Sequence, residues 1–86
     1  MDNKLNFIFR KKPLEILIEI GKNEISYSSE ISIKTNCTLA HTIRIINKLE
    51  ELKIINSKKI GRKRELKLTQ KGKEICEHIN EVIKKI

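Results

Sequence analysis

Residue types that build metal sites and disulfides are scarce in this chain. It has two cysteines, Cys37 and Cys76, which lie far apart and form no C-x-x-C pair. This spacing argues against a zinc site and against a disulfide framework. Cys37 could act as a redox switch, although a lone cysteine is more often a buried or inert thiol. We therefore expect no bound metal.

Combinations of residues that perform catalysis are also missing from the sequence. It contains no glycine-rich phosphate loop, no carboxylate pair in an apolar setting and no nucleophile with a plausible base. The two histidines, His41 and His78, fall in different predicted helices, and neither has an acidic or thiol constellation around it. We therefore predict a protein that is not an enzyme and needs no cofactor.

Aromatic residues and long apolar runs are few. Modules that bind single-stranded RNA stack bases on aromatic side chains, and the basic segment 54–68 contains none of the three aromatic residues. No apolar run approaches the ~20 residues that cross a bilayer, and the first residues lack the apolar core of a signal peptide. We expect a cytoplasmic, reduced protein without a membrane partner.

Acidic residues are outnumbered, with 11 aspartates and glutamates against 19 lysines and arginines. The net charge of +8 is unevenly placed, because residues 54–68 alone carry +5. Such a balance points to a polyanionic partner. At 86 residues the chain is one domain at most. We divide it into an N-terminal arm (1–12), a core (13–68) and a C-terminal helix (69–86).

The clearest helical pattern lies in residues 38–52, TLAHTIRIINKLEEL. At about 100° per residue, Leu39 and the isoleucines face one side, which we expect to join the core. The opposite side includes His41, Arg44, Asn47 and Lys48. Such groups reach base edges and phosphates in a major groove, so we predict a recognition helix. A solvated amphipathic helix is the alternative, and His41 fits a phosphate contact or a bystander position slightly better than base readout.

Two short helices are expected before the recognition helix. The first spans 13–21, after which Ile25 points inward from a brief extended segment. Ser28 or Ser29 can cap the second helix, and Thr38 can cap the recognition helix. The second of these helices ends at about Thr35, and a tight turn joins it to the recognition helix. With the polar side of the recognition helix outward, this pair forms a helix-turn-helix.

Beyond residue 52 the hydrophobic period becomes that of strands. Leu66 and Leu68 are two residues apart and share a face, as in a half-buried strand, and Gly61 gives a hairpin tip its backbone freedom. The cations around this tip are Lys58, Lys59, Arg62, Lys63 and Arg64. Because unpaired cations are not buried in a core, we predict a basic wing over 56–67 that lies along the phosphate backbone or in the minor groove. A solvated edge hairpin is the alternative.

The last segment predicts a helix with an apolar seam. Thr69 is its expected N-cap, and Gly72 is a tolerated weak point inside it. The seam contains Ile75, Ile79, Val82, Ile83 and Ile86. It could pack on the first helix or pair with its copy in a second chain. Because the N-terminal arm also carries Phe7 and Phe9, we favour a homodimer with both segments in the interface.

These elements follow the order of a winged helix-turn-helix, an α+β fold that is mainly α, with three helices, a two- to three-stranded wing and a C-terminal helix. The run 38–75 resembles the MarR-like regulators and their small archaeal relatives in its RIINKL, LKII and LTQKG stretches and in its basic wing. The resemblance implies a dimeric transcription regulator with Arg44 facing the major groove and with Arg62 and Arg64 in the wing. Two features depart from the family: Gly61 replaces a common aspartate that orients the wing arginine, and the chain has little room for an effector pocket.

Two functions follow as hypotheses. The first is sequence-specific binding of double-stranded DNA by a homodimer, with base readout from the recognition helix and phosphate contacts from the wing. Ser28, Ser29, Thr38 and the run 10–12 would add phosphate contacts, and two recognition helices would enter successive major grooves. The second is a protein-interaction subunit of a transcription or replication assembly.

Overall fold

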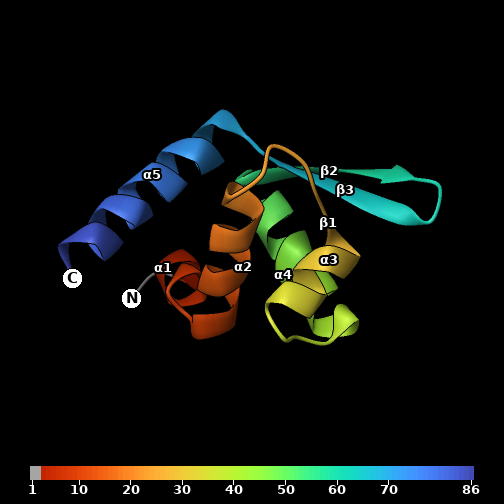
Figure 1. The fold of residues 1–86 in the computed structure, drawn as a ribbon, viewed down its shortest axis with the longest axis horizontal. Helices are drawn as coiled ribbons and strands as arrows, with labels where there is room; N and C mark the ends of the chain where they lie inside the picture. The colour runs from red at the N-terminus through yellow and green to blue at the C-terminus, as the bar shows by residue number, and fades with distance from the viewer. Residues whose placement is uncertain (1–2) are drawn as a thin grey trace.

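The computed structural model describes residues 3–86, in which helices lie beside a small antiparallel sheet (Figure 1). The elements are α1 (Asn3–Ile8), α2 (Lys11–Gly21), β1 (Ser26–Tyr27), α3 (Ser28–Lys34), α4 (Leu39–Glu51), β2 (Ile55–Ile60), β3 (Lys63–Leu68) and α5 (Gln70–Lys85). The chain is therefore α+β and mainly helical, which confirms the predicted fold class.

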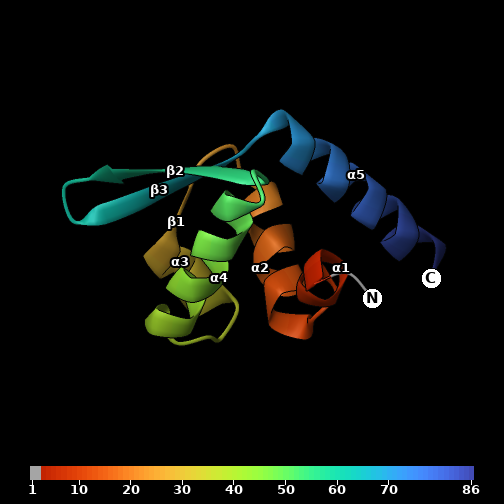
Figure 2. The same ribbon diagram turned by 180° about the vertical axis from the view of Figure 1, so that it is seen from behind.

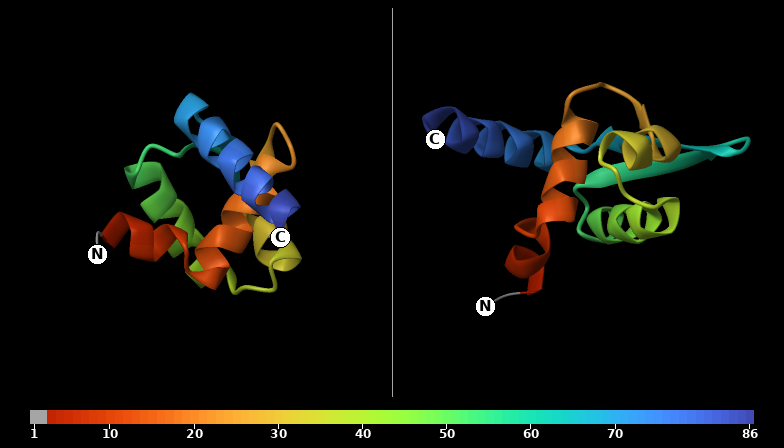
Figure 3. Two further views of the ribbon diagram at one scale, coloured as in Figure 1. Left: turned by 90° about the vertical axis from the view of Figure 1, so that its left-hand side faces the viewer. Right: turned by 60° about the horizontal axis from the view of Figure 1, so that its bottom comes forward.

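The molecule is elongated, with extents of 39 × 25 × 23 Å. The β2–β3 hairpin projects from one end, and α5 extends toward the other, where the C-terminus lies, while α1 lies beside the start of α2 (Figures 1 and 3). Seen from behind, α4 lies in front of α3, between the hairpin and the pair formed by α1 and α2 (Figure 2). The predicted recognition helix thus has the hairpin on one side and the N-terminal helices on the other.

The core lies where α2, α3 and α4 meet the sheet. Its buried apolar residues are Ile16, Leu17, Ile20, Ile31, Ile45, Ile46, Leu49, Ile54, Ile55, Leu66 and Cys76. Within α2 and α4 these residues recur every three or four positions, so each helix buries one face. Full burial of such a side chain stabilises the fold by about 1.5 to 3 kcal/mol. The core therefore fixes α4 against both α2 and the hairpin.

The turn between α3 and α4 has the predicted cap. Thr38 Oγ1 accepts a hydrogen bond from the backbone N–H of His41 at 3.2 Å, which satisfies one of the free N–H groups of the first turn. Asn36, in the turn, has a φ of 52°, a left-handed conformation that asparagine tolerates better than most residues. The observed helix agrees with the predicted span 38–52, because Thr38 is its N-cap and Leu52 its C-cap.

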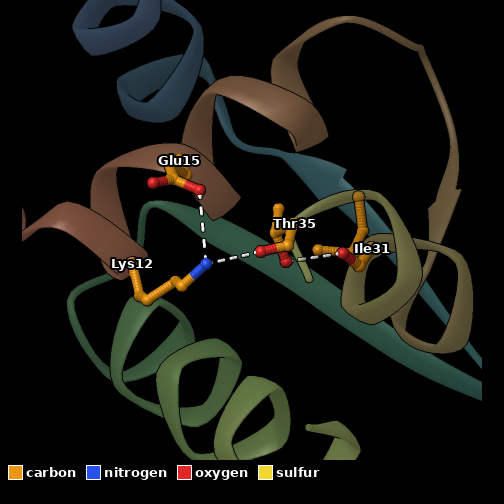
Figure 4. A network of polar contacts seen from close by, with 4 residues as sticks. All are labelled: Lys12, Glu15, Ile31 and Thr35. Carbon is orange, nitrogen blue, oxygen red and sulfur yellow. Dashed lines mark hydrogen bonds and ion pairs between the residues drawn. The ribbon is translucent and has the colours of Figure 1, made fainter. Parts of the chain in front are cut away.

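A polar network ties α2 to the end of α3 (Figure 4). Lys12 Nζ donates a hydrogen bond to the carbonyl oxygen of Thr35 at 2.6 Å and lies 3.6 Å from a carboxylate oxygen of Glu15. The Thr35 hydroxyl in turn donates to the carbonyl oxygen of Ile31 at 2.7 Å. A cation is favoured at the C-terminal end of a helix by the helix dipole. Lys12 therefore stabilises the point at which the chain leaves α3 for α4.

The predicted wing is the β2–β3 hairpin, and β1 adds a third strand in the order β1-β3-β2. Ile60 pairs with Lys63, which leaves Gly61 and Arg62 as the two-residue turn. Gly61 has a φ of 59°, and a positive φ at this position is what tight hairpin turns require.

The C-terminal helix begins as predicted, but Gly72 has a different role from the one expected. Thr69 Oγ1 accepts a hydrogen bond from the Gly72 N–H at 3.0 Å, which caps α5. A Cβ atom at position 72 would lie only 2.1 Å from the carbonyl oxygen of Ile54. Glycine is therefore needed here for the close approach of α5 to the start of the hairpin, and the prediction of a merely tolerated weak point was wrong.

Part of the predicted N-terminal arm is a helix. Asn3–Ile8 form α1, and Phe7 and Ile8 pack against the core; residues 1–2 of the arm lie outside the described residues. The sequence did not predict this helix because its six residues are too few to show a clear period.

Two apolar residues are more exposed than expected. Ile25 is 41% exposed and the neighbouring Ser26 is buried instead, because the two-residue strand β1 turns Ser26 toward the sheet interior. Leu39 is 51% exposed, although the helical wheel places it on the core side. The first turn of α4 lies beyond the packed region, and burial in α4 begins at Thr42.

Candidate nucleic-acid interface

The polar side of α4 is accessible. His41, Arg44 and Asn47 are exposed, and Lys48 is half-buried, with its Nζ 3.7 Å from a carboxylate oxygen of Glu51. Arg44 lies three positions from His41 and from Asn47 and four positions from Lys48, so all four residues share one side of the helix. The helix can present an imidazole, a guanidinium and an amide to a ligand along about 9 Å of its length, at a rise of about 1.5 Å per residue.

The hydroxyl groups predicted to bind phosphate differ in their exposure to solvent. Ser29 and Thr38 are exposed, and the Thr38 hydroxyl also caps α4. Ser28 is buried. The N-cap position of α3 is Tyr27 and no side chain caps this helix, so the prediction that Ser28 or Ser29 caps it was wrong. The chain passes directly from the edge strand β1 into α3 at this residue. Ser28 therefore does not offer its hydroxyl at the surface.

The cations of the wing surround a shallow hollow. Its volume is about 370 Å³, and its lining residues are Ser57, Lys59, Arg62, Lys63 and Arg64. Lys58, Lys59, Arg62 and Lys63 are exposed and Arg64 is half-buried. The Lys63 ammonium group lies 5.0 Å from the centre of the Tyr27 ring, within reach of a cation–π interaction. The hollow concentrates positive charge at the hairpin.

Glu50 joins α4 to this wing. One oxygen of its carboxylate accepts hydrogen bonds from the backbone N–H of Ser57, at 2.9 Å, and from the Ser57 hydroxyl. Its other oxygen lies 3.6 Å from Nη2 of Arg64. Glu50 was not predicted from the sequence, because Arg64 is 14 positions away and no local spacing relates the two. The only sequence signal is an acidic residue next to a basic hairpin.

A second groove lies on the other side of α4. Its volume is about 390 Å³, and its lining residues are Phe7, Arg10, Lys12, Pro13, His41, Arg44 and Ile45. Lys12 is engaged with Thr35 and Glu15 and is half-buried. Of the predicted phosphate contacts in the run 10–12, Arg10 and Lys11 are exposed, and of these two Arg10 lines the groove beside the recognition helix.

The residues predicted for a dimer interface divide into two groups. Phe7, Ile75 and Ile79 are partly buried and pack against the chain's own core. Phe9, Val82, Ile83 and Ile86 are exposed. The seam of α5 therefore packs on its own domain near the start of the helix and becomes free toward the C-terminus.

The two cysteines have different surroundings. Cys76 is buried against α2, with its Sγ 3.9 Å from the carbonyl oxygen of Leu17, and burial raises the pKa of its thiol. A protonated, buried thiol is a poor nucleophile. Cys37 is half-buried beside the α3–α4 turn.

Residues 3–86 contain neither a cluster of metal ligands nor a helix suited to span a membrane. Within this range, no three histidine, cysteine, aspartate or glutamate side chains gather closely enough to hold a metal ion. None of the helices in the same range has the length and apolar character to cross a membrane.

Comparison with known proteins identifies the family. No family model matches the chain. An uncharacterized protein of Archaeoglobus fulgidus is 33% identical over 87 residues, which cover 95% of this chain and 90% of the relative. The crystal structure of AF1382 from the same organism matches with a TM-score of 0.82 at 32% identity, over 95% of this chain and 94% of that one. SPO1453, a MarR family transcriptional regulator from Silicibacter pomeroyi, matches with a TM-score of 0.77 at 15% identity, over 87% of this chain and 54% of that one.

The chain belongs to the family of this archaeal protein, with a MarR-like winged-helix fold. The predicted resemblance is therefore confirmed. In this MarR-like winged helix, Gly61 occupies the position before Arg62 at which the resemblance led us to expect an aspartate. The carboxylate that pairs with a wing arginine comes from α4 instead, because Glu50 lies beside Arg64. Arg64 of the wing is thus oriented by a carboxylate of the recognition helix α4.

Proposed function

We propose that the protein is a regulator that binds double-stranded DNA. One observation carries this proposal: Glu50 joins α4 to the cationic wing. The exposed polar side of α4 and the positive charge of the wing therefore lie next to each other. The diameter of an α-helix suits a major groove about 12 Å wide, and the wing charge suits the phosphate backbone beside it.

The two parts of this surface have separate roles. Base readout belongs to α4, through His41, Arg44, Asn47 and Lys48. Arg44 can form a bidentate pair with guanine, and Asn47 can do so with adenine. Phosphate contacts belong to Lys58, Lys59, Arg62, Lys63 and Arg64 of the wing, with Ser29, Thr38 and Arg10 closer to α4. These contacts supply affinity and register but little sequence information.

A homodimer completes the proposal. Support comes from the exposed apolar residues Val82, Ile83 and Ile86 in the part of α5 that points away from the wing (Figure 1), and from Phe9, which is exposed after α1. A two-fold axis through this part of α5 would leave both wings and both α4 helices free. The two helices would then enter major grooves about one helical turn, or 34 Å, apart on a pseudo-palindromic site.

Control of transcription is the role that such binding supports. SPO1453, which shares the fold, is described as a transcriptional regulator. At 15% identity that likeness concerns the fold alone, so the regulatory role rests on the DNA-binding surface of this chain.

Selection from a pool of random duplexes tests the proposal. Repeated capture by the purified protein should enrich an inverted repeat whose half-sites are about 10 base pairs apart. Enrichment of a single, unrepeated half-site would contradict the dimer but keep sequence-specific binding. Failure to capture any duplex at low salt would contradict DNA binding and favour a protein-interaction subunit.

A further inference from the structure

Glu50 is an unusual residue to find at the junction of the recognition helix and the wing. A carboxylate near a DNA-binding surface repels phosphates, so an unpaired one would weaken binding. This side chain is 41% exposed, yet it is shared between two strands of the wing. Ser57 of β2 donates to one oxygen, and Arg64 of β3 lies beside the other.

The contacts of Glu50 act on the hairpin as a whole. Lys59 pairs with Arg64 and Ser57 pairs with Leu66 across the two strands, so Ser57, Arg64 and the buried Leu66 point to the face of the hairpin that meets α4. One carboxylate thereby fixes both strands to the last turn of the recognition helix. The angle between wing and helix is then set by a polar contact as well as by the core.

The same contact orients one cation of the wing. The Arg64 side chain is 23% exposed, and it lines the hollow together with the exposed Lys59, Arg62 and Lys63. An arginine held on one edge by a carboxylate keeps its remaining N–H groups available in a fixed direction. Pairing with Arg64 also reduces the repulsion between Glu50 and a phosphate.

We propose that Glu50 is a positioning residue that locks the wing to the recognition helix and directs Arg64 toward a DNA phosphate bound at the hollow. This inference rests on the proposed function of duplex binding. It adds a residue that contacts no DNA itself and that acts through Ser57 and Arg64.

Glu51 offers a matched control, because it is the next residue in the same helix and carries the same charge. Its side chain is 70% exposed and its carboxylate lies 3.7 Å from Nζ of Lys48. Among residues 3–86, no hydrogen bond or ion pair joins Glu51 to the wing, in contrast to Glu50. Glu50→Gln and Glu51→Gln remove the same charge from nearly the same place. Any general gain in affinity from lower repulsion should therefore be similar in the two variants.

The first experiment compares binding of these variants to one duplex by fluorescence anisotropy across salt concentrations. Glu51→Gln should bind as tightly as the wild type or more tightly, with an unchanged slope of log K against log salt. Glu50→Gln should bind the duplex about five-fold more weakly than Glu51→Gln. A loss of this size is typical when one side chain of a hydrogen-bonded and ion-paired network is removed. The slope of log K against log salt for Glu50→Gln should fall by about one released counterion, because Arg64 is no longer oriented toward its phosphate.

The second experiment needs no DNA. In amide hydrogen exchange of the free protein, Glu50→Ala should speed exchange of the Ser57 amide about ten-fold, because its acceptor is lost, while Glu51→Ala should leave it unchanged. Melting curves of all four variants verify that each is folded.

The outcomes separate this inference from the proposed function. If the wild type binds duplexes with a steep salt slope and the Glu50 and Glu51 variants behave alike in both experiments, the positioning role is overturned and DNA binding stands. If the wild type binds no duplex at low salt, the proposed function is overturned and the role of Arg64 falls with it. Exchange at Ser57 then still decides whether Glu50 anchors the wing.

Discussion

Arg44 carries the one guanidinium on the exposed side of α4. Replacing it with alanine should relax the preference at one defined base position, because the bidentate pair with guanine is lost, at a cost of about 1 to 3 kcal/mol for the preferred site. Competition with single-base variants of the selected site measures this loss. Lys84→Ala, which removes the same charge from the last turn of α5, should leave the preference intact. An unchanged preference in Arg44→Ala would show that α4 does not read bases as proposed.

Gly72 provides a test of the packing between α5 and the hairpin. Alanine is favoured over glycine in helix interiors by about 1 kcal/mol, so propensity alone predicts that Gly72→Ala stabilises the protein. The new Cβ would lie 2.1 Å from the Ile54 carbonyl oxygen, and we therefore expect a loss of about 1 to 3 kcal/mol, as for overpacked cores. Thermal unfolding decides the sign, with Lys73→Ala as an exposed control in the same turn. A higher melting temperature for Gly72→Ala would refute the close approach.

At the scale of elements, the wing is expected to act through charge. Lys59 and Arg62 are exposed and line the hollow of the wing. The double variant Lys59→Ala, Arg62→Ala should weaken binding to all duplexes to a similar extent and lower the salt slope by about 2, one for each lost phosphate contact. Titrations with specific and random duplexes across salt concentrations measure both effects.

A matched pair of substitutions controls for the change in net charge. Lys84→Ala, Lys85→Ala removes two charges from the last turn of α5, at the end of the molecule opposite the wing. It should change the slope little, because charges beyond about 10 Å are screened at 0.1 M salt. Equal effects of the two double variants would mean that net charge, and not the wing, drives binding.

The elements themselves were largely predictable from the sequence. A 3.6-residue period over 13 residues identifies α4, and the pair Leu66 and Leu68 with Gly61 identifies the hairpin, because both signals are local. The short helix α1 and the two-residue strand β1 were missed, since neither is long enough to show a period. Leu39 was placed on the wrong side because a helical wheel does not say where along a helix the packing stops.

Contacts within the candidate site were less predictable than the elements that carry it. The exposed residues His41, Arg44 and Asn47 follow from the period of α4. The contacts of Glu50 with Ser57 and Arg64, and of Lys12 with Thr35, join residues that only the folded chain brings together. Sequence spacing carries no information about such pairs, so the inferred connection between helix and wing required the structure.

At the scale of the whole molecule, the exposed end of α5 is expected to hold two copies together. Val82 is exposed, and a glutamate there would bring a charge into an apolar interface, which costs free energy through desolvation. Val82→Glu should therefore convert the dimer to a monomer in analytical ultracentrifugation. Asn80→Glu adds the same charge beside the seam and should leave the dimer intact. A wild type that sediments as a monomer at all concentrations would contradict this interface.

The central claim is that α4 and the wing form a surface for duplex DNA. Its most direct test is an anisotropy titration of the wild-type protein against random duplexes at several salt concentrations. Log K should fall linearly with log salt, with a slope equivalent to several released counterions, because the wing and its neighbours neutralise phosphates. Absence of binding even at low salt would contradict the claim, and the basic hairpin would then be a solvated edge or a surface for a protein partner.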